Sequence, residues 1–279
     1  MYKIVAKREL APKIKLFEVD APEIAAKAGP GQFVIIRQHE TGERVPLTIT
    51  DYDREKGTIT IVFNEVGKTT KELGTFEEGD CIRNIAGPLG NPSEIQKFGR
   101  VLCVGGGVMV APLYLVAKAL REAGNELVVV VGARIKELLI FEKEMKEIAD
   151  EFYVTTDDGS EGYQGLEFLT DILAKKKFDR VVVMGPVIMM KTVSEMTKPF
   201  NVKTVVTLTP IMVDGMGMCG ACRVTVKGET KFGCVDGPEF DGHQVDFDEL
   251  IKRQRVYLAE ERLASVFYEK LGGLASDEA

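Results

Sequence analysis

Tryptophan is absent from the 279-residue sequence, and histidine occurs only twice, as His39 and His243. So few imidazole groups argue against a histidine-based metal site and against a Ser-His-Asp hydrolase. Positive charge is also in deficit, because 36 Lys and Arg residues stand against 43 Asp and Glu residues and give a net charge of −7. An acidic chain has no electrostatic reason to bind nucleic acid, so we expect none among its partners.

Long hydrophobic runs are missing too. The longest uncharged stretch, residues 101–117, is interrupted by glycines and a proline, which predicts a strand, a loop and a helix start rather than a membrane span. The segment MYKIVAKREL has no apolar run after its charges, so we expect no secretory signal. Five cysteines, an odd number, then argue against a disulfide framework and favour a reducing, cytoplasmic location.

The pattern of hydrophobic residues changes along the chain and divides it into regions. Residues 1–95 hold short runs such as KIVAKREL, QFVIIRQ and GTITIVF between Gly, Pro and Asp turns, which predicts a β barrel. Residues 96–207 alternate apolar runs such as VLCVGG and RVVVMG with segments of helical spacing, which predicts an α/β domain with a parallel sheet. Residues 208–279 contain a Gly- and Cys-rich loop, a short hairpin and a helix at 258–271, and form the third expected domain.

The third region carries the sharpest local signal. Asp214, Cys219, Cys222 and Cys234 are spaced D-x4-C-x2-C-x11-C, where plant-type [2Fe-2S] sites have C-x4-C-x2-C and a distant Cys. Short spacings let one glycine-rich loop wrap a cluster, and thiolates suit iron, so we predict these four residues as ligands in a small iron-sulfur domain. A structural zinc site fits the same residue types, although such sites more often use two C-x2-C pairs. Asp214 could also be a turn residue.

Two segments of the predicted barrel have the chemistry of a flavin site. The strand RVPLTIT carries a cation, two apolar residues and a hydroxyl, namely Arg44, Pro46, Leu47 and Thr48. The turn in NEVGKTTKEL opens a short helix with Gly67, Lys68, Thr69 and Thr70. Cations and helix N-terminal amides neutralise a diphosphate, and a hydroxyl can hydrogen-bond the flavin N5. The turn is not a P-loop, because Val62 holds the position of the first glycine.

Loops at the ends of the predicted parallel strands indicate a nicotinamide nucleotide site. Glycines between a buried strand and a helix allow close approach of a diphosphate to the helix N-terminus. The residues expected at these strand ends are Gly105, Gly106 and Gly107 after the first strand, Arg134 after the second, and Gly185 and Pro186 after a later one. Asp157 and Asp158, in TTDDGSEG, are predicted to lie on the nicotinamide side, and a solvated turn is the alternative for this loop.

With barrel, sheet and cluster loop in this order, the whole chain resembles the electron-transfer subunits of the ferredoxin-NADP reductase superfamily. This family includes the subunit of class B dihydroorotate dehydrogenase and the small subunit of NADH-dependent ferredoxin:NADP oxidoreductase, also known as sulfide dehydrogenase subunit beta. Asp214 and the segment CVDGPEFDGHQVDFDEL favour the second member. The resemblance implies one FAD, one [2Fe-2S] cluster and an NAD(H) site. It also implies a heterodimer with a larger subunit, which carries another flavin and [4Fe-4S] clusters and performs electron bifurcation.

Two residues depart from the family pattern near the expected nicotinamide. Met109 stands at the later glycine of GGGxGxAP, and Met184 replaces the cysteine of the C-G-P motif. Arg134 could meet a 2′-phosphate, and no acidic residue ends that strand, so NADP(H) is the alternative nucleotide. The family's use of NAD(H) favours NAD(H).

These features together predict an oxidoreductase subunit. Hydride passes between NAD(H) and FAD, with Thr48 tuning the flavin and Arg44 anchoring it, and single electrons pass between the flavin and the cluster. The nearest alternative is the electron-transfer subunit of a dihydroorotate dehydrogenase or a hydrogenase. An alternative of another class is a zinc-binding module that senses nucleotide without catalysis.

Overall fold

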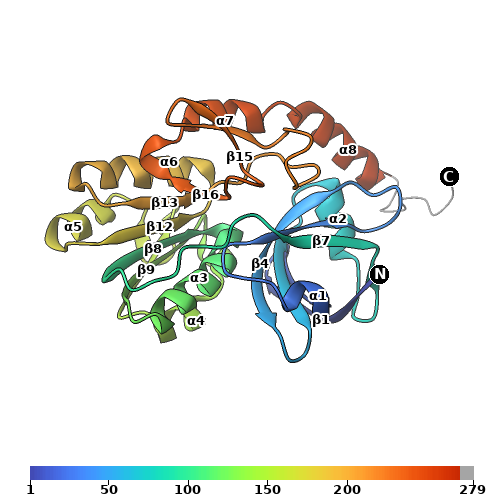
Figure 1. The fold of residues 1–279 in the computed structure, drawn as a ribbon, viewed down its shortest axis with the longest axis horizontal. Coiled ribbons are helices and arrows are strands. Elements are labelled where there is room, and N and C mark those ends of the chain that lie inside the picture. The colour runs from blue at the N-terminus through green and yellow to red at the C-terminus, as the bar shows by residue number, and fades with distance from the viewer. Residues whose placement is uncertain (271–279) are drawn as a thin grey trace.

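The computed structural model describes residues 1–270. Two bodies, each built on a seven-stranded sheet, follow one another along the chain, and the C-terminal segment crosses both (Figure 1). The barrel lies on the right of Figure 1 and the α/β sheet on the left, with the orange and red segment along the top. None of the helices within residues 1–270 combines the length and hydrophobicity needed to span a bilayer.

The first body is an antiparallel barrel with the strand order β6-β1-β2-β5-β4-β3-β7. Its elements are β1 (Tyr2–Ala11), β2 (Ile14–Asp20), α1 (Pro22–Ala25), β3 (Phe33–Arg37), β4 (Val45–Asp53), β5 (Thr58–Asn64), α2 (Lys68–Gly74), β6 (Cys81–Ile82) and β7 (Asn84–Leu89). Only Arg83 separates the two outermost strands, so the sheet curls until it nearly closes. Alternating β-branched and aromatic side chains fill the interior around Phe17 and Phe63, as the sequence predicted.

The second body is a sheet with the order β11-β10-β9-β8-β12-β13-β16, parallel except for its last strand. Its strands are β8 (Arg100–Gly106), β9 (Glu126–Ala133), β10 (Glu151–Thr156), β11 (Tyr163–Gln164), β12 (Arg180–Met184), β13 (Thr204–Thr207) and β16 (Glu239–Asp241). Helices α3 (Val110–Glu122) and α4 (Glu142–Ile148) contribute to the core on one face, and α5 (Phe168–Lys175) and α6 (Val187–Thr197) to the core on the other. Coverage on both faces explains the continuous apolar runs of β8, β9 and β12.

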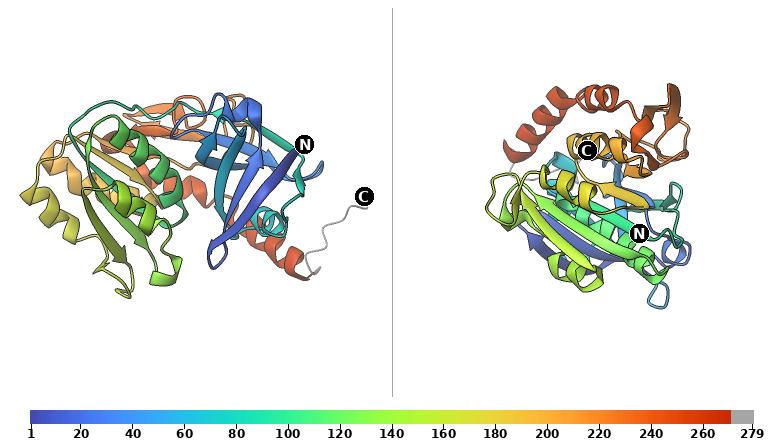
Figure 2. Two further views of the ribbon diagram at one scale, coloured as in Figure 1. Left: turned by 90° about the horizontal axis from the view of Figure 1, so that it is seen from below. Right: turned by 90° about the vertical axis from the view of Figure 1, so that its left-hand side faces the viewer.

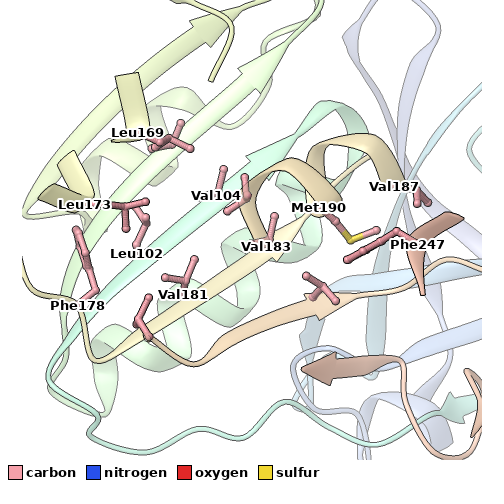
Figure 3. Close-up of a cluster of buried hydrophobic side chains, with 14 of the residues drawn as sticks. Leu102, Val104, Leu169, Leu173, Phe178, Val181, Val183, Val187, Met190 and Phe247 are labelled. Atoms are coloured by element: carbon pink, nitrogen blue, oxygen red, sulfur yellow. The ribbon is translucent and has the colours of Figure 1, made fainter. Parts of the chain in front are cut away.

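Figure 3 shows the core on the α5 and α6 face, where Leu169, Leu173 and Met190 lie over the strands that carry Leu102 and Val183. Phe247 from the C-terminal segment joins this cluster, so the third region shares the hydrophobic core of the sheet.

The C-terminal segment contains the predicted hairpin of β14 (Arg223–Val226) and β15 (Glu229–Phe232), then α7 (Phe247–Gln254) and α8 (Leu258–Lys270). The expected helix at 258–271 is present to Lys270, and residues 271–279 of the expected third domain lie outside the described residues. The sequence did not predict β16, which pairs antiparallel with β13. Helix α8 reaches back to the barrel, where Lys71 of α2 donates to Ser265 and pairs with Glu269 (Figures 1 and 2).

Candidate functional site

A cavity of about 260 Å³ lies where the barrel, the sheet and the C-terminal segment meet. Its walls are mostly apolar and carry a few hydroxyl groups, which is the character of a small-molecule or cofactor site. The lining residues used below are Phe33, Pro46, Leu47, Thr48 and Thr70 from the barrel, Val108, Met109 and Pro112 from the loop and helix after β8, and Thr207, Leu208 and Met212 from the segment that ends and follows β13.

The predicted flavin strand is one wall of this cavity. Pro46, Leu47 and Thr48 belong to β4, which pairs with β3 so that Thr48 lies opposite Phe33. Arg44 is exposed and directly precedes β4. The strand therefore presents one hydroxyl and two apolar side chains to the cavity and carries a cation at its start.

The second flavin segment forms the turn into α2. Thr70 lines the cavity, but its hydroxyl accepts hydrogen bonds from the backbone amides of Val66 at 3.1 Å and Gly67 at 3.2 Å, so it holds the turn together. The hydroxyl of Thr69 donates to Glu43 at 3.0 Å. A Cβ on Gly67 would meet nothing within 4 Å, which leaves open space beside this turn and the half-exposed Lys68.

The three glycines after β8 differ in what they do. A Cβ on Gly105 would approach Leu113 Cδ2 to 2.8 Å, and one on Gly106 would approach Met189 Sδ to 2.5 Å, so both serve close packing. Gly107 has a φ of +57° and faces open space. Of the predicted diphosphate loop, Gly107 is therefore the residue with room for a ligand.

Gly185 and Pro186 follow β12, beside the glycine loop. Gly185 lies against the side chain of Met189, and the backbone nitrogen of Gly106 is 3.3 Å from the Cβ position of Gly185. Met184, the residue in place of the family cysteine, is fully buried. Met189 therefore packs against both glycine motifs, a contact that sequence reasoning did not predict.

The loop after β10 lies beside the end of β9. The backbone amides of Asp157 and Asp158 donate to the carbonyls of Ala133 at 3.1 Å and Arg134 at 3.3 Å. Asp158 accepts from the amide and hydroxyl of Ser160, and the hydroxyl hydrogen bond in particular lowers the pKa of this carboxyl. Arg134 and the two acidic residues thus share one exposed edge of the sheet, at the carboxyl ends of the strands, where open sheets bind ligands.

The cluster loop begins at Asp214, which sequence reasoning placed first among the metal ligands. One carboxylate oxygen accepts from the amide of Met216 at 2.7 Å, and the other accepts from the amide of Cys219 at 2.6 Å. The Met216 hydrogen bond, helped by that of Cys219, lowers the pKa of Asp214 and keeps the carboxylate ionised. The amide of Ala221 points at Cys219 Sγ from 3.5 Å, the kind of contact that tunes a cluster-bound sulfur.

Cys222 and Cys234 are brought together by the hairpin of β14 and β15. Their sulfurs are 3.2 Å apart and both residues are buried. Burial, with the neighbouring Cys222 thiol, raises the pKa of Cys234 to about 12, so the Cys234 thiol ionises only beside a strong positive charge. That donor chemistry fits an iron-sulfur cluster.

The four predicted ligands do not all lie as close together as Cys222 and Cys234 do. Within residues 1–270, no three His, Cys, Asp or Glu side chains are grouped closely enough to hold a single metal ion. Cys219 is exposed on the same loop as Asp214. Asp214, Cys219 and Cys222 lie on the loop before β14, Cys234 follows β15, and joint ligation by the four residues stays a prediction.

Phe33 and Met212 connect the cavity with the cysteines. Both line the cavity, and both pack in one hydrophobic cluster with Cys222 and Cys234. Sequence reasoning missed these two residues, and only their proximity to the motifs could have indicated them. The cluster loop also seats tightly on the barrel, because Gly215 has a φ of +73° and a Cβ there would lie 2.7 Å from Ile35 Cγ1.

Comparison with known proteins assigns the family. Residues 209–246 match the iron-sulfur cluster binding domain of dihydroorotate dehydrogenase B. A homolog of the dihydroorotate dehydrogenase B (NAD(+)) electron transfer subunit from Thermotoga maritima is 50% identical, over 97% of this chain and 96% of that protein. The subunit from Clostridium perfringens is 34% identical, over 81% of this chain and 90% of its own length. This chain belongs to the family of dihydroorotate dehydrogenase B electron-transfer subunits.

A solved structure agrees with this family. It is described as giving insights into flavin-based electron bifurcation via the NADH-dependent reduced ferredoxin-NADP oxidoreductase. It is 50% identical, matches with a TM-score of 0.91, and the match covers 97% of this chain and 98% of that chain. Far more distant reductases, such as a ferredoxin NADP+ reductase from Neisseria gonorrhoeae at 18% identity and a TM-score of 0.60, share the fold over 72% of this chain and 90% of their own. The predicted electron-transfer family, its ferredoxin reductase-like fold and its iron-sulfur region are thereby confirmed.

Proposed function

We propose that this chain is the electron-transfer subunit of an NADH-dependent, bifurcating ferredoxin:NADP oxidoreductase. It exchanges hydride between NAD(H) and FAD, and single electrons between that flavin and a [2Fe-2S] cluster. The chain is 50% identical to the bifurcating oxidoreductase structure and 34% identical to the Clostridium perfringens protein named as a dihydroorotate dehydrogenase subunit, which supports this partner system. The Thermotoga maritima protein, also 50% identical, is named only as a homolog of that subunit.

One observation carries the proposal. A single cavity is walled by the predicted flavin strand through Thr48, by the nucleotide loop through Met109, and by the cluster segment through Met212. A ring bound there contacts the nucleotide side on one wall, and Phe33 and Met212 join the cavity to the hydrophobic cluster that contains Cys222 and Cys234. Binding, orientation and water exclusion are what the protein contributes, since the cofactors supply the redox chemistry.

The chain's own residues divide between three ligands. Pro46, Leu47 and Thr48 hold the isoalloxazine, and Arg44 with the turn Gly67, Lys68, Thr69 and Thr70 holds the FAD diphosphate. Gly105, Gly106, Gly107, Gly185 and Pro186 shape the nicotinamide nucleotide site, Arg134 contacts its ribose, and Asp157 and Asp158 lie on its nicotinamide side. Asp214, Cys219, Cys222 and Cys234 hold the cluster.

The electron-transfer family implies a larger catalytic partner. We infer that this partner carries a second flavin and [4Fe-4S] clusters, and that it receives electrons from the cluster on this chain in the cytoplasm. The net charge of −7 gives this chain no electrostatic reason to recruit nucleic acid.

Anaerobic purification tests the proposal. The chain should carry one FAD and two iron atoms, and excess NADH should bleach the flavin absorption. A colourless protein that contains zinc would refute the proposal and favour a nucleotide-sensing zinc module. Co-purification of a dihydroorotate dehydrogenase instead of a larger iron-sulfur flavoprotein would reassign the partner system.

A further inference from the structure

The hydroxyl of Thr207 is buried without a hydrogen-bond partner. Thr207 ends β13 and is only 2% exposed. Among the described residues, its Oγ1 and the Oε1 of Gln38 are the buried side-chain oxygens that no donor or acceptor satisfies. The Gln38 amide at least uses its nitrogen, which donates to the carbonyl of Thr69, whereas the single polar atom of the Thr207 side chain has nothing.

Other buried threonines show how unusual this is. The hydroxyl of Thr50 donates to the carbonyl of Thr60 at 3.1 Å, and that of Thr204, on the same strand as Thr207, donates to Thr197 at 2.7 Å. Thr156 donates to the carbonyl of Glu161 at 2.9 Å. Leaving a buried hydroxyl unpaired destabilises a fold, so an unpaired one beside a cavity indicates a ligand that completes it.

The position of Thr207 identifies which ligand. It lines the same cavity as Thr48 and Met109, but from the carboxyl end of the sheet rather than from the barrel. Its own backbone is fixed by pairing with Glu239 of β16, and the next residue donates its amide to Pro238 at 2.9 Å. A threonine held by a fixed backbone in a mostly apolar wall suits the hydrogen-bonding edge of a bound heterocycle.

We propose that Thr207 is a cofactor-binding residue whose hydroxyl hydrogen-bonds the polar edge of the ring held in this cavity. The inference rests on the proposed function, in which that ring is the isoalloxazine of FAD. Thr207 then fixes the ring from the sheet side while Thr48 contacts it from the barrel side, so both bodies hold the flavin together.

The test replaces Thr207 by Val, which keeps the shape and removes the hydroxyl, and by Ser, which restores the hydroxyl. Thr204→Val is the matched control, since it removes a buried hydroxyl of the same strand that is already bonded within the protein. Each full-length variant is titrated with FAD, and the dissociation constant, the visible flavin spectrum and the melting temperature with and without FAD are measured.

Thr207→Val should weaken FAD binding about five- to tenfold and shift the flavin absorption bands, and Ser should restore both. Without FAD, Thr207→Val should melt at the same temperature as the parent or higher, because an unpaired buried hydroxyl is gone. Thr204→Val should show the reverse, with a lower melting temperature and an unchanged flavin spectrum.

The inference fails if Thr207→Val binds FAD with the parent's affinity and spectrum. It also fails if the variant melts lower without FAD, which would reveal a purely structural role. In either of these outcomes, normal FAD binding by the parent and by Thr204→Val leaves the proposed function intact. If the parent itself binds no FAD, the proposed function and this inference fall together.

Discussion

Phe33 of β3 lies directly opposite Thr48 of β4 in the antiparallel ladder. The same phenylalanine packs with Cys222 and Cys234 through the hydrophobic cluster that joins the barrel to the C-terminal segment. A residue of the predicted flavin strand and the buried cluster cysteines are therefore linked through one side chain. Under the proposed function, this link makes a sequence separation of more than 170 residues a short path for electrons.

Shortening Phe33 should damage both stability and electron flow. Phe33→Ala leaves a cavity beside the cysteines and should lower the free energy of unfolding by about 3–5 kcal/mol, as measured by urea denaturation. Phe33→Leu should cost less and keep the fold. In Phe33→Leu, NADH should still reduce the flavin at the parent rate, whereas cluster reduction should slow. If flavin reduction and cluster reduction each proceed in Phe33→Leu at the parent's rate, Phe33 is not on the path between the flavin and the cluster.

The glycines after β8 should respond differently to a methyl group. Gly106→Ala drives its Cβ against Met189 and should destabilise the protein by about 1–3 kcal/mol, part of which Met189→Ala should restore. Gly107→Ala meets no atom but has a φ of +57°, so it should cost about 1–2 kcal/mol that Met189→Ala does not restore. It should also raise the NADH dissociation constant, because the methyl group enters the open space. Thermal melts and NADH titrations of the single and double variants separate the two effects.

Replacing Asp214 should change the reduction potential and the spectrum of the cluster if Asp214 is a ligand. A hard anionic oxygen favours the ferric state, so Asp214→Cys should raise the reduction potential and change the EPR spectrum of the reduced cluster. Asp236→Asn is the control, because Asp236 accepts a hydrogen bond from the amide of Phe232 at 2.6 Å in the same region. An Asp214→Cys spectrum and potential identical to the parent's would assign Asp214 to the turn alone.

Glu239 should make stability depend on pH. Burial raises the pKa of this carboxyl above its ordinary 4.5, against the opposing effects of the Ser93 hydroxyl and Arg180. Between pH 4.5 and the raised pKa, Glu239 holds a proton in the folded chain that it has lost in the unfolded chain. The contribution of Glu239 to the free energy of unfolding is therefore full below pH 4.5 and declines as the pH rises through the folded pKa. Glu239→Gln should therefore melt higher than the parent at pH 7, and the two should converge below pH 4.5.

Glu94 supplies a control, because its pKa is shifted in the opposite direction to that of Glu239. Its hydrogen bond to Arg180, at 2.7 Å, lowers the pKa of Glu94, so its contribution is present at neutral pH and is lost as the pH falls through that lowered pKa. Glu94→Gln should melt lower than the parent at pH 7. If Glu239→Gln also melted lower at pH 7, burial of the charge would not be the dominant effect at Glu239.

Local patterns predicted most of the architecture. Alternation predicted the barrel strands, and continuous valine runs predicted β9 and β12. The hairpin that brings Cys234 to Cys222 was also predicted, with residues 223–226 paired against 231–233, whereas the observed second strand is Glu229–Phe232. Strand β16 was not predicted, because its three residues, Glu239–Asp241, are too few to show a hydrophobic alternation. Their extended conformation depends instead on pairing with β13.

The site was predictable only as separate motifs. Spacing identifies Cys219 and Cys222, and glycine runs identify the loop at Gly107, since each depends on local chain geometry. Phe33, Met189 and Thr207 carry no such pattern, and their importance arises from tertiary contacts that bring distant segments together. The functional division among Gly105, Gly106 and Gly107 likewise depends on the neighbours of each one.

The order of reduction after mixing with NADH tests the central claim most directly. Anaerobic stopped-flow absorption would follow the flavin, and freeze-quenched EPR samples would follow the reduced cluster in the same purified chain. The cavity shared by the nucleotide loop, the flavin strand and the cluster segment predicts that flavin bleaching comes first and that the cluster signal follows at the expense of reduced flavin. A fully reduced flavin with a cluster that stays oxidised, although dithionite reduces it, would contradict the account.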